Sequence, residues 1–412
     1  MGFQSGLSGL NTAAKNLDVI GNNVANSSVV GFKSSTTQFA DVFANSLVGG
    51  GASEVGIGAK VANVAQQFTQ GNLTTTSNPL DIAINGKGFF RLDDNGSITY
   101  SRNGQFRFDP NGYIVTSEGK NLTGYPVDAN GNILPAAPTA IQIDFADVPP
   151  QTTSQFTLGM NFDSRETPPT TAIFNPADPT SYNFSTSGNV FDTLGNSHIF
   201  TMYFVKTATA GQWQMYGQVD GTALANADIG AGAGNPVTVN FDNTGQLTTG
   251  MPLNASLTVA TGAVTPLAYT FDLTGSTQYG SDFGVNDLTQ NGYASGRLAG
   301  FNVSDSGIIV GRYTNGQSRN LAQVVLADFR NPQGLKPLGD NQWAESADSG
   351  LAIVGAPNSG SLGVLQSSAV EDSNVDLTAE LVNMITAQRV YQANAQTIKT
   401  QDAILQTLVN LR

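Results

Sequence analysis

Residues 375–412 read VDLTAELVNMITAQRVYQANAQTIKTQDAILQTLVNLR, and the spacing of the apolar side chains in this stretch predicts a long helix. These side chains recur at alternating four- and three-residue steps, which is typical of a coiled-coil helix. Asp376 is placed to cap the helix, and Glu380 adds negative charge to its first turn. The apolar positions are Leu377, Leu381, Met384, Tyr391, Ala395, Ile398, Leu405 and Val409. The spacing predicts a helix over residues 374–411.

The other end of the chain has the same four-three pattern. Its apolar positions are Phe3, Leu7, Leu10, Ala14, Leu17 and Val24, with Gly21 as a small member of the series. A cluster of asparagines, Asn22, Asn23 and Asn26, and then Gly31 follow the pattern and end the helix. The sequence therefore predicts a second coiled-coil helix over residues 3–25.

Each predicted helix also has a second line of apolar residues. One partner helix covers one seam, so two apolar faces require more than one neighbour. The helices either form an internal hairpin that leaves some leucines exposed, or they pack between copies of the protein. The charge distribution favours packing between copies. The formal net charge is zero over residues 1–45 and −2 over residues 365–412, against −13 for the whole chain, so the ends repel one another little.

The sequence between the helices is typical of β structure. Apolar residues alternate over 80–84, and Asn85-Gly86 separates them from the apolar run 89–92, a pattern that predicts a hairpin. Further turns rich in Asp, Asn and Gly recur at residues 93–96, 109–112, 128–131 and 242–245. They lack the residue order and the distal Glu of an EF-hand, so we interpret them as hairpin turns rather than calcium sites.

These patterns together predict the fold class. We expect a mostly β protein with long α-helical termini, in which two nested β domains of barrel or sandwich type are inserted between N- and C-terminal coiled-coil helices. The expected parts are terminal helices at 1–30 and 370–412, a connecting arm at 31–72 and 358–369, a first β domain at 73–147 and 289–357, and a second, outer β domain at 148–288.

Composition excludes several classes of function. The chain has 18 basic and 31 acidic residues and no basic cluster, so it is a poor candidate for binding nucleic acid. It has no Cys, which excludes disulfides and thiolate metal sites, and no run of about 20 apolar residues that would form a membrane helix. No secretory signal peptide is visible at the start.

The sequence offers no candidate catalytic, cofactor-binding or metal-binding residue. A Ser-His-acid triad would need His198, the single histidine, with Asp192 or another acid to orient it. His198 lies in a predicted strand whose alternate residues face solvent, so we expect an ordinary surface histidine. We expect no bound cofactor or metal, and no enzyme activity.

Three separated stretches resemble one family. Residues 5–35, SGLSGLNTAAKNLDVIGNNVANSSVVGFKSS, resemble the N-terminal motif of the bacterial flagellar axial proteins, which are the rod, hook and hook-associated subunits. Residues 78–92 and 100–128, and the quoted C-terminal stretch, are similar to the hook and distal-rod branch of that family. The motif residues of the N-terminal stretch are Asn23, Ala25, Asn26, Gly31, Phe32 and Lys33.

The resemblance implies a structural function. The inserted segment 148–288 favours a hook subunit over the shorter distal rod subunit. Such a subunit is exported through the flagellar type III apparatus without a Sec signal, and polymerises under a hook cap into a curved, flexible tube outside the cell. The tube acts as a universal joint that transmits motor torque from rod to filament. The implied partners are further copies of the chain, the distal rod, the hook cap and the hook–filament junction proteins.

Alternatives remain at this stage. A distal rod or hook-associated subunit is the near alternative, and a secreted monomeric adhesin or enzyme is the distant one. The family places the stretch after the first helix as an arm against neighbouring subunits, and its apolar residues include Phe39, Val42, Phe43 and Phe68. These residues either contact a neighbour or cover the base of the first β domain.

Overall fold

A computed structural model describes the chain except for residues 1, 43–55, 57, 129–130 and 411–412. The chain forms two compact units. Unit 1 contains Met1–Phe145, Gly300–Arg312 and Ser318–Arg412, and unit 2 contains Ala146–Ala299 and Tyr313–Gln317. The predicted fold class, mostly β with helical termini, is confirmed.

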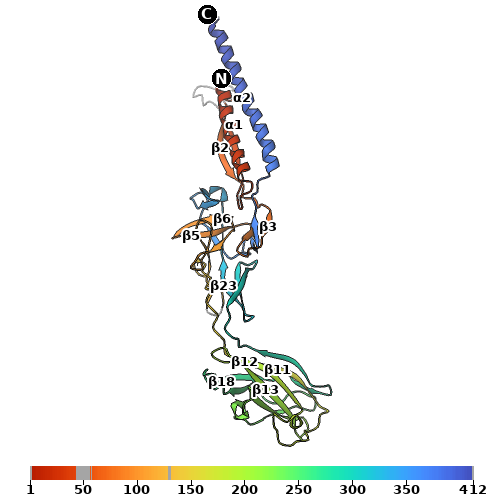
Figure 1. Cartoon of the computed structure of the whole chain (residues 1–412). Helices are drawn as coiled ribbons and strands as arrows, with labels where there is room; N and C mark the ends of the chain where they lie inside the picture. The colour runs from red at the N-terminus through yellow and green to blue at the C-terminus, as the bar shows by residue number, and fades with distance from the viewer. Residues whose placement is uncertain (1, 43–55, 57, 129–130, 411–412) are drawn as a thin grey trace. The chain divides into compact units, whose positions relative to one another are not determined.

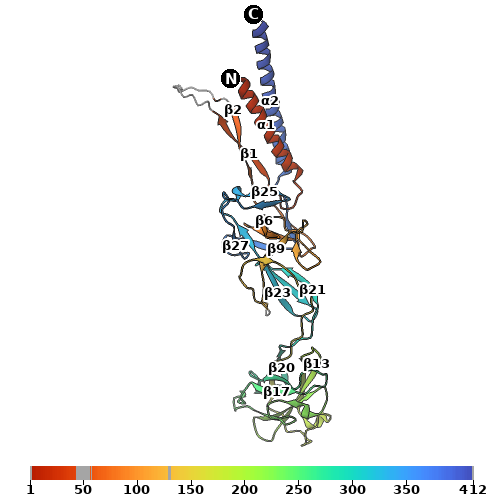
Figure 2. The same cartoon turned by 90° about the vertical axis from the view of Figure 1, so that its left-hand side faces the viewer.

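Two long helices form the ends of unit 1. They are α1, Gly2–Ala25, and α2, Leu377–Asn410, within a few residues of the predicted bounds. The Asp376 carboxylate accepts hydrogen bonds from the backbone amides of Thr378 and Ala379, so the predicted cap is confirmed. The helices lie side by side and antiparallel, and α2 extends beyond the start of α1 (Figures 1 and 2).

A two-stranded antiparallel ribbon follows α1 and lies beside it (Figure 2). It consists of β1, Ser35–Val42, and β2, Gly58–Gln66, with a register shift between Gln38 and Phe39. The Ser8 hydroxyl of α1 accepts a hydrogen bond from the backbone amide of Ala59 at 3.3 Å, which joins β2 to the helix.

Two further strand pairs bring the beginning and the end of unit 1 together. β3, Leu73–Thr75, pairs with β29, Ala369–Glu371, and β4, Ile82–Asn85, pairs with β28, Val364–Ser367. The prediction of a hairpin at Asn85-Gly86 is wrong, because β4 pairs with β28 and not with the strand that follows it. Both flanking strands exist, but Gly86 has a φ of +115° and lies against the backbone of Gly363.

In the described part of unit 1, the main sheet has thirteen strands. Its central path runs β21 (Leu298–Val303), β22 (Ile308–Tyr313), β23 (Ser318–Val324), β9 (Asn121–Tyr125), β5 (Phe89–Asp94), β6 (Ser97–Ser101), β26 (Gln342–Ala344) and β25 (Lys336–Gly339). Its side strands are β7 (Arg107–Phe108), β8 (Ile114–Val115), β10 (Thr139–Ala140), β24 (Leu326–Asp328) and β27 (Ile353–Gly355). Phe89, Tyr100, Phe329 and Trp343 form an aromatic cluster in its core.

Unit 2 is a sandwich of two sheets around one large apolar core. One sheet contains β11 (Gln155–Asp163), β15 (Ala227–Asp228), β17 (Leu253–Leu257), β18 (Leu267–Asp272), β19 (Thr277–Tyr279) and β20 (Gly284–Gln290). The other contains β12 (Phe184–Phe191), β13 (Ser197–Lys206), β14 (Gln212–Val219) and β16 (Val237–Asn240). Trp213 and Phe156 are fully buried between them.

The boundary between the β domains differs from the expected one. Residues 289–299 were expected in the first β domain, but they belong to unit 2. The reason is that β20 pairs antiparallel with β11, and residues 293 and 296 form bridges to Gln151 and Val148. The predicted turn at residues 109–112 has the expected chemistry, because the Asp109 carboxylate accepts from the amides of Asn111 and Tyr113.

Candidate functional site

The two terminal helices meet through small residues. A Cβ placed on Gly6 would lie 3.1 Å from Cγ1 of Ile398, and one placed on Gly9 would lie 2.6 Å from Oδ1 of Asn394. Ala387 is buried on the same side of α2. Glycine therefore allows the close approach of α1 and α2 within one chain.

The predicted apolar seams take part in this hairpin only in part: Ile398 lies opposite Gly6, but several seam residues stay exposed. On α2, Leu381 is 44% exposed and Leu405 is 53% exposed. The other seam residues exposed to solvent are Phe3, Leu7, Leu377 and Tyr391, and the half-buried ones are Leu10, Ala14, Leu17, Val24, Met384, Ala395 and Ile398. The side chain of Val409 lies outside the described residues. In the single chain, Gly6 and Gly9 of α1 make the closest contacts with α2, and the leucines Leu377, Leu381 and Leu405 are exposed to solvent.

A second apolar line on α2 is also open. It comprises Val382, Ile385, Val390 and Ile404, each about half exposed. Because Gly6 lies opposite Ile398 and α1 begins at Gly2, the part of α2 from about residue 402 onward extends past α1 (Figure 1). The helix pair thus exposes more apolar surface than a complete two-helix interface would.

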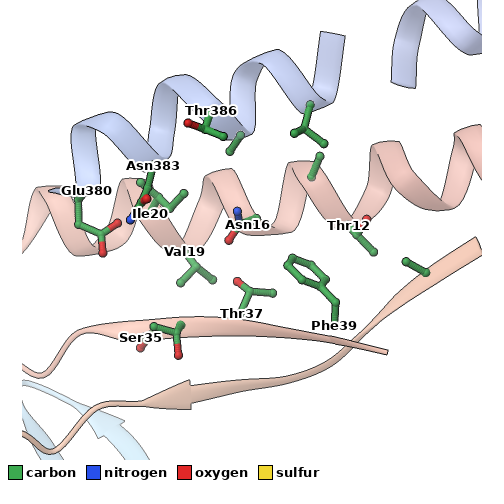
Figure 3. A pocket seen from close by; sticks show the side chains of 15 residues that line it. Thr12, Asn16, Val19, Ile20, Ser35, Thr37, Phe39, Glu380, Asn383 and Thr386 are labelled. Carbon is green, nitrogen blue, oxygen red and sulfur yellow. The ribbon is translucent and has the colours of Figure 1, made fainter. Parts of the chain in front are cut away.

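A cavity of about 590 Å³ lies between α1, α2 and the β1–β2 ribbon (Figure 3). Its walls are mostly apolar and include Val19, Ile20 and Phe39. Among the described residues of its lining, Oγ1 of Thr37 and Oε2 of Glu380 are buried and have no hydrogen-bond partner. The cavity therefore combines an apolar surface with two unsatisfied polar atoms.

The motif residue Asn23 joins three elements. It is buried, and its side-chain amide donates to the carbonyl of Ser35 at 2.8 Å and accepts from the amide of Ser35 at 2.9 Å. It also donates to Oε1 of Glu380 on α2 at 3.3 Å. Asn23 thus fixes the start of β1 against both helices. Two other motif residues lie nearby: Asn26 bonds back to Asn22, and Ala25 is exposed.

A buried ion cluster lies just beyond the helices, and we call Lys33, Arg102 and Glu371 the Glu371 cluster. Lys33 Nζ donates to Glu371 Oε1 at 2.6 Å, and Arg102 Nη1 donates to Glu371 Oε2 at 3.2 Å. The side chains of Lys33 and Glu371 are fully buried. Burial lowers the pKa of Lys33, and the charge of Glu371 acts in the opposite direction. The cluster links the segment after α1, the strand before α2 and the first β domain.

Gly31 is required beside this cluster. Its φ is +72°, and a Cβ there would lie 2.6 Å from the backbone nitrogen of Asn103. Its amide donates to the carbonyl of Glu371 at 2.7 Å, while Phe32 is half-buried. Glu371 and Arg102 were not predicted, because 269 residues separate them. The usable signal was Lys33, since a lysine in an apolar context needs a carboxylate when it is buried.

The expected arm residues divide into two groups. Phe39 is 49% exposed at the edge of the cavity, Val42 is half-buried, and Phe43 lies outside the described residues. Phe68 packs edge-on against Phe89 and Trp343 of the unit 1 core, at ring distances of 5.4 and 5.5 Å. Of the two interpretations, contact with a neighbour or cover for the base of the first β domain, the second therefore applies to Phe68.

His198 is not the surface residue that the strand pattern predicted. It is 3% exposed, because its side of β13 faces the Asp192 turn and the residue after β14. Both ring nitrogens face carboxylates, so it does not activate a serine. Among the described residues, no group of three or more acidic or histidine side chains is placed to hold a metal ion. None of the helices in the described part of the chain has the length and apolarity that crossing a membrane requires.

Family models match successive parts of the chain. The model of the flagellar basal body rod protein matches residues 3–33, and that of the flagellar basal body rod FlgEFG protein C-terminal matches residues 366–411. Between them, the flagellar hook protein FlgE/F/G D1 domain matches residues 83–191, and the flagellar basal body protein FlaE D2 domain matches residues 161–293. The matches follow the order of helix, two β regions and helix.

Relatives match the chain from end to end. The flagellar hook protein FlgE of Escherichia coli is 44% identical over 100% of both chains, and that of Salmonella typhimurium is also 44% identical over both full lengths. The FlgE of Treponema pallidum is 32% identical over 99% of this chain and 98% of its own. In fold alone, the crystal structure of Helicobacter pylori FlgE2 is similar, with a TM-score of 0.50 and 13% identity over 73% of this chain and 99% of that one. The chain therefore belongs to the flagellar hook protein FlgE family and is a structural subunit of the flagellar hook, not an enzyme.

Proposed function

We propose that the open apolar faces of α1 and α2 pack against the same helices of neighbouring copies, and that this contact builds the hook tube. The observation that supports it is the exposure of leucines on α2, such as Leu381 and Leu405, at positions spaced for a coiled coil. Each leucine removed from water contributes about 1.5–3 kcal/mol. The polymerisation residues are the predicted seam residues of both helices.

The cavity and the β1–β2 ribbon belong to the same contact. A neighbouring copy that covers the cavity would bury Phe39 and supply a hydrogen-bond partner to Oγ1 of Thr37 and a donor to Oε2 of Glu380, the two atoms that lack partners. In this arrangement the ribbon is an arm, and Val42 is the last residue of β1. The motif residues hold the base of the arm, because Asn23 bonds to the first residue of β1.

The proposal extends to the other parts of the flagellum. The resemblance supports export through the flagellar type III apparatus, a location outside the cell, and contacts with the distal rod, the hook cap and the hook–filament junction proteins. A tube that acts as a universal joint needs firm inner contacts and outer contacts that exchange easily. The low charged fraction of 12% suits such outer contacts, because neutral hydrogen bonds exchange between partners and water at little net cost.

The test uses exposed helix residues. The double variant Leu381→Gln, Ile385→Gln should fold normally, because both side chains face solvent in the single chain. Removing two buried side chains from each subunit contact, at about 1.5 kcal/mol each, should raise the concentration needed for tube formation by about a hundredfold. Electron microscopy and sedimentation of the full chain measure this concentration.

A matched variant controls for the replacement of an exposed apolar side chain by a polar one. Leu351→Gln changes a side chain that is 81% exposed in unit 1 but lies outside both helices, and it should assemble like the parent chain. Tubes that form at the parent concentration from the double variant would refute the packing of this face between copies.

A further inference from the structure

The single histidine of the chain lies at one end of the unit 2 sandwich. His198 is on β13, opposite Val190 of β12. Its Nδ1 is 2.6 Å from Oδ2 of Asp220, the residue after β14, and its Nε2 is 3.2 Å from Oδ2 of Asp192. The ring is thus enclosed between two carboxylates that come from different connections of the sandwich.

This geometry has a consequence for the proton. A neutral imidazole has one donor and one acceptor nitrogen, whereas an ionised carboxylate only accepts. With both nitrogens of His198 facing carboxylate oxygens, a neutral ring would set one lone pair against another. A protonated ring donates from both nitrogens and satisfies Asp192 and Asp220 together.

Asp192 connects the ring to two loops. Its Oδ1 accepts from the backbone amides of Leu194 and Asn196 at 2.9 Å, which forms the turn between β12 and β13. Its Oδ2 accepts from the hydroxyl of Thr261 at 2.6 Å, in the connection between β17 and β18. Loss of the imidazolium would therefore affect the turn, this connection and the end of β14 at once.

We propose that His198 is a proton-dependent latch, which in its protonated form holds the Asp192 turn, the Thr261 loop and Asp220 together, and which loosens this end of unit 2 when the proton leaves. The latch consists of His198, Asp192, Asp220 and Thr261. It is independent of the packing of the terminal helices.

The pKa directions agree with this geometry. Burial lowers the pKa of His198, but the hydrogen bonds and charges of Asp220 and Asp192, the charged groups that face the ring, outweigh it and raise the pKa above 6.5. Since the folded pKa is the higher one, the stabilisation is complete below pH 6.5 and is lost as the pH rises through the folded pKa. For Asp192, burial raises the pKa, but bonds from Thr261, Asn196 and His198 hold it far below 3.8, so its contribution is lost only in strong acid.

The first experiment observes the ring directly. Because the chain contains one histidine, the full chain labelled with ¹³C in its histidine ring gives a single Cε1–H signal by NMR. The latch predicts a titration midpoint above 6.5, the ordinary value. A midpoint at or below 6.5 would overturn it.

A conservative variant separates the latch from simple burial. Asp220→Asn keeps the acceptor for the amide of Ile199, and Asn tolerates the φ of +50° at this position. It removes one negative charge from the ring, so the midpoint of His198 should fall. Asp242→Asn, at an exposed turn of the same unit, is the matched control and should leave the midpoint unchanged. An equal midpoint in the parent and both variants would refute the latch.

Amide exchange tests the loosening itself. As the pH rises through the measured midpoint, the amides of Leu194 and Asn196 should lose protection relative to those of Thr244 and Gln246. The latter pair bonds to Asp242 in the same manner, without a histidine, and so corrects for base-catalysed exchange. If the amide protection in both turns changed with pH in the same way, His198 would not stabilise the Asp192 turn, and the latch would be overturned.

Discussion

Single residues hold the terminal helices to the first β domain. In the Glu371 cluster, one carboxylate bridges Lys33, which follows α1, and Arg102, which follows β6. Glu371 also accepts from the amide of Gly71 at 2.9 Å, so its oxygens satisfy three donors. Buried ions are strongly destabilising when one partner is lost, because the remaining charge has no compensation.

A change at Glu371 tests this cluster. Glu371→Gln keeps the shape of the side chain but leaves Lys33 and Arg102 buried without a counter-charge, so we expect a loss of about 3 kcal/mol of unfolding free energy. Urea denaturation of the full chain measures the loss. Asp372→Asn, at the next residue and in contact with Thr74 near the surface, should change the stability by less than about 0.5 kcal/mol. Similar losses in the two variants would contradict the role of the cluster.

At the scale of elements, α1 has two kinds of face. Gly6 and Gly9 face α2, and they bring the helix axes close within one chain. Leu7 and Phe3 lie on open surface instead. Gly21 has no atom within 4 Å of an added Cβ and belongs to the open side. The glycines of α1 therefore contact α2 within the hairpin, whereas its larger side chains Phe3 and Leu7 are exposed to solvent.

Two glycine variants separate these faces. Gly9→Leu places a side chain where Asn394 lies, so it should separate α1 from α2 and reduce the unfolding free energy by about 1–3 kcal/mol. Gly21→Leu enters open space and should raise helix stability by about 0.5–1 kcal/mol. Circular dichroism during denaturation distinguishes them. Equal effects of the two variants would mean that the glycine face does not set the contact between the helices.

At the scale of the whole molecule, the chain is nested. The pairings β3–β29 and β4–β28 join the stretch after the ribbon to the stretch before α2. The two helices are therefore the N- and C-terminal elements of unit 1 and lie side by side. Unit 2 is formed by the middle of the chain and has its own core. This order places the helices at the two ends of the chain, while the two β regions fold around separate cores.

Much of this arrangement could be predicted from local patterns. The helices, the Asp376 cap and strands such as β13 and β22 follow from periodicity and turn chemistry, which act over a few residues. The pairing of β4 with β28 could not, because the two strands lie at opposite ends of the β region of the chain. The burial of His198 could not either, because it depends on how the Asp192 turn and the residue after β14 fold over one side of β13. The seam pattern predicts that the apolar faces form coiled-coil surface, which stays a prediction, and it did not show that glycines make the close contacts of the hairpin.

Thiol protection tests most directly whether copies of the chain pack through their helices. The chain has no cysteine, so single variants Leu381→Cys and Leu405→Cys give labelling without background. Both positions are exposed in the single chain and should react rapidly with a maleimide as monomer, then become protected by more than about tenfold in assembled tubes. Leu351→Cys controls for access of the reagent. Equal labelling of Cys at 381 and 405 in monomer and tube would contradict helix packing between subunits.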